Sequence, residues 1–138
     1  MIRTEEDRPD WWTGWACAQM GVMIYPPYQA IGFVDDEGTA RGAVVFYDFS
    51  PRNVEIAVAG LWTKQVFRVL GHHCFNVLKV ERVTARTRNP KVARVIEAAG
   101  FRREGTARSF YPGGQDALLF GMLRAECKWF DSLPSNRD

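Results

Sequence analysis

One carboxylate interrupts an apolar run near the middle of the chain. Glu55 lies in residues 54–59, whose other members are all apolar. If its side chain points among these neighbours, desolvation raises its pKa and lets it accept a proton near neutral pH. Strict alternation along a strand gives the other interpretation, in which Val54 and Ile56 point inward and Glu55 faces solvent. Both interpretations are open, and the first makes Glu55 a candidate general base.

The residues that follow this run suit an anion. Thr63, preceded by Trp62, is a good N-cap for a segment with helical apolar spacing. The free N–H groups and the positive dipole end of such a helix attract phosphate groups. Lys64 and Arg68 are one turn apart and share a face, where they add positive charge. The alternative is a capped surface helix with solvated basic side chains.

Three further places carry polar residues that could take part in chemistry. Asn89, followed by a proline, is a strong helix cap. Tyr111 precedes a Pro-Gly-Gly turn, where it is either a general acid or an aromatic residue packed on the sheet. His72 and His73 are adjacent, and adjacent side chains on a helix do not share a face. The sequence therefore predicts no metal site.

Periodicity and turn residues predict an α+β (mixed α/β) chain. The expected elements are a helix over residues 10–20, strands over 28–35, 39–49 and 54–59, a helix from 63, a strand over 80–87, a helix over 90–99, strands over 101–110 and 117–123, and a short closing helix over 123–130. The central strand–helix–strand unit should place strands 54–59 and 80–87 parallel, with a right-handed crossover. We expect one domain over residues 1–131 and a frayed tail over residues 132–138.

Length and composition fit one globular domain. The chain has 138 residues, of which 46% are hydrophobic and 25% charged, with a net charge of +2. This charge is too weak to indicate nucleic-acid binding, and a solvated face is the favoured interpretation of the arginines between residues 82 and 108. Three cysteines without paired spacing fit a reducing compartment. With no signal peptide or membrane-length apolar run, we expect a cytoplasmic protein without membrane contact.

The second half of the chain resembles a known enzyme family. Residues 78–105, LKVERVTARTRNPKVARVIEAAGFRREG, resemble the GNAT (GCN5-related N-acetyltransferase) family, because Asn89, Gly100-Phe101 and Gly105 stand at the family's spacing. Residues 109–129, SFYPGGQDALLFGMLRAECKW, resemble the final hairpin of the same family. The likeness covers about residues 28–130. It looks closest to short members from phages and prophages and to those that look like ribosomal-protein N-acetyltransferases.

The resemblance implies a fold, a reaction and a set of site residues. It implies a GNAT-like twisted mixed sheet of about six strands flanked by helices, and transfer of acetyl from acetyl-CoA to an amine of a small molecule, peptide or protein. Transfer would be direct in a ternary complex, since no activated Cys or Ser is evident. A homodimer is the assembly to consider. The implied catalytic residues are Glu55 and Tyr111, and the implied cofactor-binding residues are Ala57, Val58, Ala59, Trp62, Thr63, Lys64, Arg68 and Asn89.

Two departures from the family pattern support alternatives. The loop that starts at Gly60 lacks the family's Gly-x-Gly, whose backbone N–H groups cradle the CoA pyrophosphate. The helix position that carries a catalytic Tyr in many members is Ile96, and the Ser found three residues after the Asn is Val92. A non-catalytic GNAT-like binding module is therefore the second hypothesis. A GNAT-like enzyme that modifies nucleic acid is the third.

Overall fold

The computed structural model describes residues 1–129, and within them seven strands form one sheet. In spatial order the strands are β1 (Arg3–Glu5), β2 (Tyr28–Val34), β3 (Ala40–Tyr47), β4 (Asn53–Ala59), β5 (Arg82–Thr87), β7 (Gln115–Leu123) and β6 (Arg102–Tyr111). The helices are α1 (Pro9–Met20), α2 (Lys64–His72) and α3 (Pro90–Ala98). The predicted α+β order and mixed sheet are confirmed, with β1 as a strand that the sequence did not predict.

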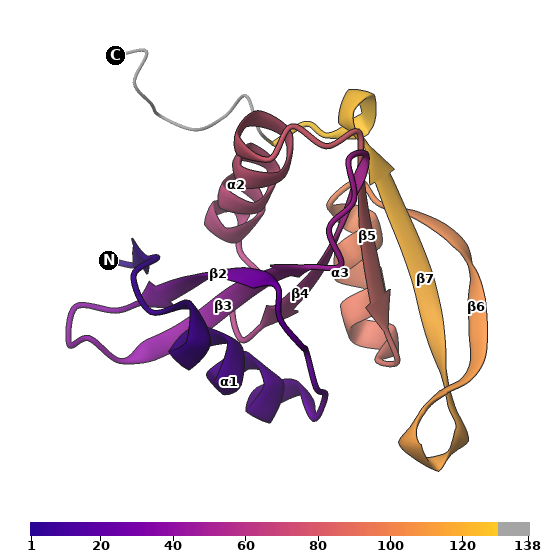
Figure 1. Cartoon of the computed structure of the whole chain (residues 1–138), viewed down its shortest axis with the longest axis horizontal. Coiled ribbons are helices and arrows are strands. Elements are labelled where there is room, and N and C mark those ends of the chain that lie inside the picture. Colours follow the sequence, from indigo (N-terminus) through magenta and orange to yellow (C-terminus); the bar gives the residue numbers. More distant parts are fainter. Residues whose placement is uncertain (130–138) are drawn as a thin grey trace.

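The sheet divides between its two parallel strands. β4 and β5 are parallel neighbours, as predicted, but their register begins at Asn53↔Arg82 and ends at Ile56↔Ala85. Beyond this point β4 still pairs with β3, and the end of β5 still pairs with β7. The two strands therefore part. In Figure 1, β2 and β3 lie across the view while β5 and β7 stand close to vertical.

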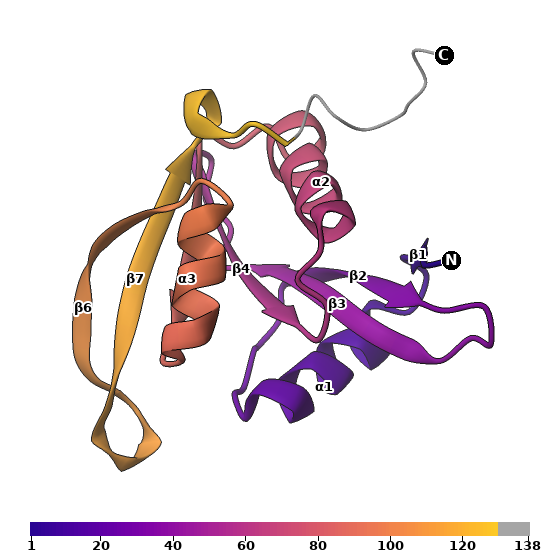
Figure 2. The same cartoon turned by 180° about the vertical axis from the view of Figure 1, so that it is seen from behind.

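Helices cover both faces of the sheet (Figure 2), and the side chains beneath them form two separate hydrophobic clusters. α2 and α3 pack on one face through a cluster that includes Phe67 and Ile96. α1 packs on the other face of β2 and β3, where Trp12 is completely buried. β4 has buried residues on both faces, because Val54, Ile56 and Val58 join the first cluster and Ala59 joins the second.

The ends of the helices follow the predicted capping residues. Thr63 Oγ1 accepts a hydrogen bond from the Val66 N–H at 3.4 Å, at the start of α2. Asn89 Oδ1 accepts from the Lys91 N–H at 2.9 Å, and Pro90 is the first residue of α3. Both predicted caps are confirmed. α2 continues into a π-helical turn over His73–Val77, which leads the chain back toward β5.

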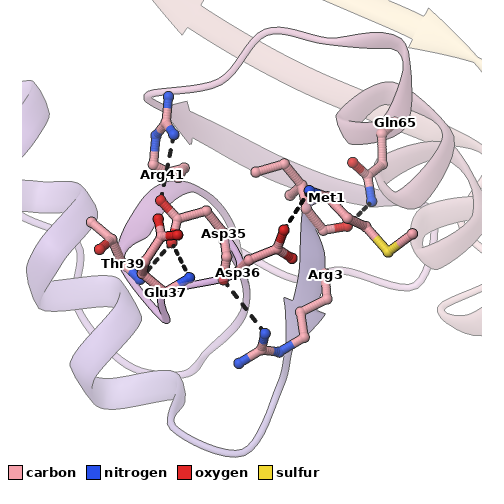
Figure 3. Close-up of polar contacts among 9 residues, drawn as sticks. Met1, Arg3, Asp35, Asp36, Glu37, Thr39, Arg41 and Gln65 are labelled. Carbon is pink, nitrogen blue, oxygen red and sulfur yellow. Dashed lines mark hydrogen bonds and ion pairs between the residues drawn. The ribbon is translucent and has the colours of Figure 1, made fainter.

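Polar contacts tie β1 to the β2–β3 turn and to α2 (Figure 3). The terminal ammonium of Met1 lies 3.2 Å from Asp36 Oδ2, and Arg3 Nη1 donates to the Asp35 carbonyl at 3.4 Å. Gln65 Nε2 donates to the Ile2 carbonyl at 3.0 Å. A polar segment of three residues shows no strand periodicity, so β1 is a strand because its backbone pairs with β2, from Arg3↔Val34 to Glu5↔Gly32, and not because of a local pattern.

The C-terminal end differs from the prediction. The expected closing helix over residues 123–130 is a single 3₁₀ turn, Arg124–Glu126, and its last expected residue lies outside the described part. The predicted frayed tail, residues 132–138, also lies outside it. Across residues 1–129, none of the helices combines the length and apolar character that a membrane crossing requires.

A tight contact in the α1 cluster gives a stability prediction. A Cβ added at Gly32 would lie 1.9 Å from Trp12 Cε2, and Trp12 has no free space because it is completely buried. We expect Gly32→Ala to lower the free energy of unfolding by about 1–3 kcal/mol. Gly14→Ala is the control: it lies in α1 with nothing within 4 Å, and should raise stability by about 0.5–1 kcal/mol. Urea unfolding measures both, and an unchanged Gly32→Ala midpoint would contradict the packing.

Candidate active site

A cavity of about 890 Å³ opens where β4 and β5 part. Its walls come from the ends of β3, β4, β5 and β6, from α3, and from the segment that joins α1 to β2. Residues of both sheet faces line it. Ile96 of α3 belongs to the first cluster and Val92 packs against it, whereas Tyr47 of β3 packs against the second cluster. The cavity therefore passes through the sheet at the fork.

The structure gathers most of the predicted cofactor residues around this cavity. Ala57, Val58, Ala59, Trp62 and Asn89 all line it, as does the predicted acid Tyr111. The remaining predicted residues lie elsewhere. Thr63 and Lys64 at the start of α2, and Arg68 one turn further along, do not line the cavity, and neither does Glu55 of β4.

The β4 edge of the cavity suits an extended amide chain. From Ala57 to Ala59 one edge of β4 pairs with β3, while the edge toward β5 has no strand partner within the described chain. Unpaired backbone N–H and C=O groups need partners when a ligand covers them. The pantetheine arm of acetyl-CoA carries amides that can supply these partners, so the observed edge fits that group.

The start of α2 has groups that suit a phosphate. No Gly-x-Gly loop precedes α2; one glycine, Gly60, turns the chain at a φ of 83°. The Thr63 hydroxyl accepts a hydrogen bond from the Val66 N–H, and the N–H groups that precede it in α2 are left for an anion. Arg68 Nε is buried and has no hydrogen-bond partner within residues 1–129. This orphaned donor and the exposed Lys64 are compatible with a phosphate group.

Glu55 is buried in a polar network at the fork. Its side chain is 8% exposed. Its Oε2 accepts hydrogen bonds from the Tyr47 hydroxyl at 3.1 Å and from Arg86 Nε. Arg86 also lies 3.9 Å from Asp48 Oδ2. The interpretation in which Glu55 faces solvent is therefore wrong. The side chains of β4 do alternate between the two faces, but both faces are covered, so the face opposite Val54 and Ile56 is buried as well.

Burial sets the protonation behaviour of this network. Desolvation raises the pKa of Glu55, and the adjacent Arg86 guanidinium and the Tyr47 hydroxyl act in the opposite direction. Burial, with the charge of Glu55, also raises the pKa of Tyr47 well above its usual value. Tyr111 has a raised pKa, mainly through burial. Both hydroxyls therefore stay protonated at neutral pH, and each can donate a hydrogen bond.

Tyr47, Arg86 and Arg88 all line the cavity. Sequence reasoning missed Tyr47, and the solvated face that it favoured for the arginines is wrong for Arg86 and Arg88, because both are half-buried in the cavity wall. Arg86 stacks over Phe110 at 4.5 Å, and Arg88 stacks over Tyr111 at 4.8 Å. A usable signal was present, because Arg82, Thr84 and Arg86 alternate with apolar residues and so share one face of β5. Within residues 1–129, no group of three metal-ligating side chains is close enough together to hold a metal ion.

Comparisons with known proteins agree with this geometry at the level of the fold. No protein-family model and no curated protein sequence matches the chain. Among solved structures, mutant forms of the Vibrio cholerae spermidine/spermine N-acetyltransferase SpeG match with a TM-score of 0.74 at 14% identity, over 91% of this chain and 96% of that chain. A dodecameric V. cholerae spermidine N-acetyltransferase matches with a TM-score of 0.74 at 12% identity, over 90% and 94%.

A third match has another origin. A T. thermophilus protein, only provisionally assigned as an acetyltransferase, has a TM-score of 0.64 at 24% identity, over 79% of this chain and 64% of that chain. The chain therefore has the GNAT fold of these acetyltransferases. This agrees with the family resemblance of residues 78–105, and identities this low define the fold alone.

The network at the fork gives a second stability prediction. Removing Arg86 leaves Glu55 buried without its counter-ion, so Arg86→Met should destabilise the protein by about 3–5 kcal/mol. The double variant Glu55→Gln/Arg86→Met removes both charges and should be more stable than Arg86→Met alone. Urea denaturation of the two single variants and the double variant measures the coupling. If the losses of unfolding free energy in the two single variants add up to the loss in the double variant, the pair is not coupled.

Proposed function

We propose that the protein is an acetyl-CoA-dependent N-acetyltransferase that acts on an amine acceptor. The observation that carries this proposal is the cavity at the fork, bordered by the partnerless edge of β4 at Ala57, Val58 and Ala59. A GNAT fold with a ligand-sized opening at this point supports it. The assignment of the pyrophosphate to Thr63, Lys64 and Arg68, and of the CoA arm to Trp62 and Asn89, remains part of the proposal.

The residues of the fork can supply the proton transfers. Acetyl-CoA, when bound, supplies the activated acyl group. An amine attacks only when neutral, so a proton must leave its ammonium form first. In this proposal, the Tyr47 hydroxyl, which lines the cavity and donates to Glu55, passes a proton to Glu55 as it takes one from the ammonium. Arg86 holds the Glu55 carboxylate in place, and Tyr111 donates a proton to the departing sulfur.

The cofactor site is tested by titration calorimetry with acetyl-CoA. Lys64→Ala/Arg68→Ala removes two cations from the first two turns of α2, and a charge-assisted hydrogen bond contributes about 1.5–3 kcal/mol. We therefore expect the dissociation constant to rise at least tenfold. Arg103→Ala/Arg108→Ala removes the same charge from exposed positions of β6 and should leave it unchanged. Equal effects of the two double variants would mean that the pyrophosphate binds elsewhere.

The catalytic base is tested by Glu55→Gln, which keeps the shape of the side chain and removes its proton acceptance. General-base assistance is worth about 10²- to 10⁴-fold, so turnover should fall by that factor while acetyl-CoA affinity is retained. Activity requires the carboxylate, so wild-type turnover should fall as pH drops through the raised Glu55 pKa. This acid limb should be absent from the Glu55→Gln profile.

The results of these assays separate the hypotheses. Full activity of Glu55→Gln would place the base elsewhere. Acetyl-CoA binding without turnover on any amine or peptide would favour the binding module, which the missing Gly-x-Gly loop also supports. Absence of acetyl-CoA binding would overturn the proposed function itself.

A further inference from the structure

One cation in the cavity wall lacks an acidic partner. Arg88 Nη2 donates to the Met20 carbonyl at the end of α1 at 3.1 Å, and its guanidinium lies 4.8 Å from the Tyr111 ring centroid. No carboxylate forms an ion pair with it within residues 1–129. A guanidinium has five N–H donors in a planar fork that matches a carboxylate. Most of its donor capacity is therefore available to a ligand.

Arg86, two residues earlier, differs in this respect. It is paired with Glu55 and lies 3.9 Å from Asp48, so two carboxylates surround one guanidinium. The Arg86 end of the site is thus acidic on balance, while the Arg88 end is cationic. Arg86 and Arg88 lie over neighbouring rings, Phe110 and Tyr111, whose centroids are 5.1 Å apart. One small molecule with an ammonium and a carboxylate can span the two ends.

The charges of the cavity wall argue against a polyamine. Asp48, Arg86 and Arg88 are the charged residues among those that line the cavity in the described chain. A polyamine carries several ammonium groups and would need several acidic partners in a row. Here its second ammonium would meet Arg88, and like charges placed together without solvent repel strongly.

The rest of the wall is apolar at the mouth. Met23, Tyr25, Phe49 and Phe110 all line the cavity although they are 72%, 71%, 37% and 46% exposed. Large apolar side chains that gather at an opening mark a binding surface for an apolar group. The wall therefore combines an acidic end, a cationic end and an apolar rim.

We propose that the acetyl acceptor is a small α-amino acid with an apolar side chain, whose carboxylate is bound by Arg88. Its ammonium would lie toward Asp48 and the Glu55–Tyr47 pair, and its side chain against the apolar rim. This inference rests on the proposed acetyl transfer and deepens it. In the step, the amine nitrogen forms an amide bond with the acetyl carbon, the thioester C–S bond breaks, and free CoA leaves with one proton.

The test measures CoA release with L-phenylalanine, L-phenylalaninamide and spermidine as acceptors. We expect the wild type to use phenylalanine with the highest kcat/KM. Arg88→Gln should raise the KM for phenylalanine at least tenfold and abolish the preference over the amide, with the KM for acetyl-CoA unchanged. Arg88→Lys should restore part of the preference, because it restores the charge without the planar fork. A purely structural role for Arg88 would change all three acceptors equally.

Three results would overturn the inference while leaving acetyl transfer intact. The first is a preference for spermidine. The second is a ratio of kcat/KM for phenylalanine to that for its amide that Arg88→Gln does not change. The third is a loss of acetyl-CoA affinity in Arg88→Gln while the KM for the acceptor stays unchanged. The last would assign Arg88 to the cofactor. Thermal unfolding confirms that each variant is folded, and Arg88→Lys serves if Arg88→Gln is not.

A binding measurement separates this inference from the proposed function. Titration of L-phenylalanine and its amide into the wild type and Arg88→Lys, without acetyl-CoA, reports carboxylate recognition directly. Tighter binding of the acid, weakened in Arg88→Lys, supports the site even if no acetyl transfer is found. Equal binding of acid and amide, or binding of neither, overturns it even if acetyl transfer to another amine is found.

Discussion

The structure depends on the point where β4 and β5 stop pairing. After Ile56 each strand keeps its other neighbour, so the sheet continues on both sides of a fork instead of ending there. The buried ion pair of Glu55 and Arg86 joins β4 to β5 at this point. A buried charge pair is weak support for stability by itself, because desolvation offsets much of the attraction. Its position favours a functional role, since a pair of apolar side chains would join the strands equally well.

The fork explains how one chain can bring unlike groups together. The face with α2 and α3 presents apolar residues and the start of α2, which suit a long cofactor. The face with α1 presents the tyrosines, carboxylates and arginines, which suit a polar acceptor. The cavity connects the two faces, so a donor that enters from one side can meet an acceptor on the other. In this account, the parting of the strands creates the space in which the proposed reaction takes place.

Local signals were sufficient for most of the fold. Helical periodicity together with Thr63 and Asn89 gave the positions of α2 and α3, and the strand–helix–strand order gave the parallel pair. β1 could not be predicted, because its pairing depends on contacts with residues far away in the sequence. Only part of the candidate site could be predicted from the sequence. Backbone positions 57–59 followed from the resemblance, whereas Tyr47 and Arg88 reach the cavity through the bend of the sheet, which no local pattern encodes.

The central claim is that the unpaired edge of β4 binds the cofactor arm. Amide hydrogen exchange of residues 57–59, measured with and without CoA, tests it most directly. Successive residues of a strand point their N–H groups to opposite edges, so only the amides of residues 57–59 that face away from β3 lack a partner. These amides should exchange readily in the free protein and become protected when CoA binds. The paired amides of β3 serve as the internal reference and should change little. Saturating CoA binding without added protection at residues 57–59 would contradict the account.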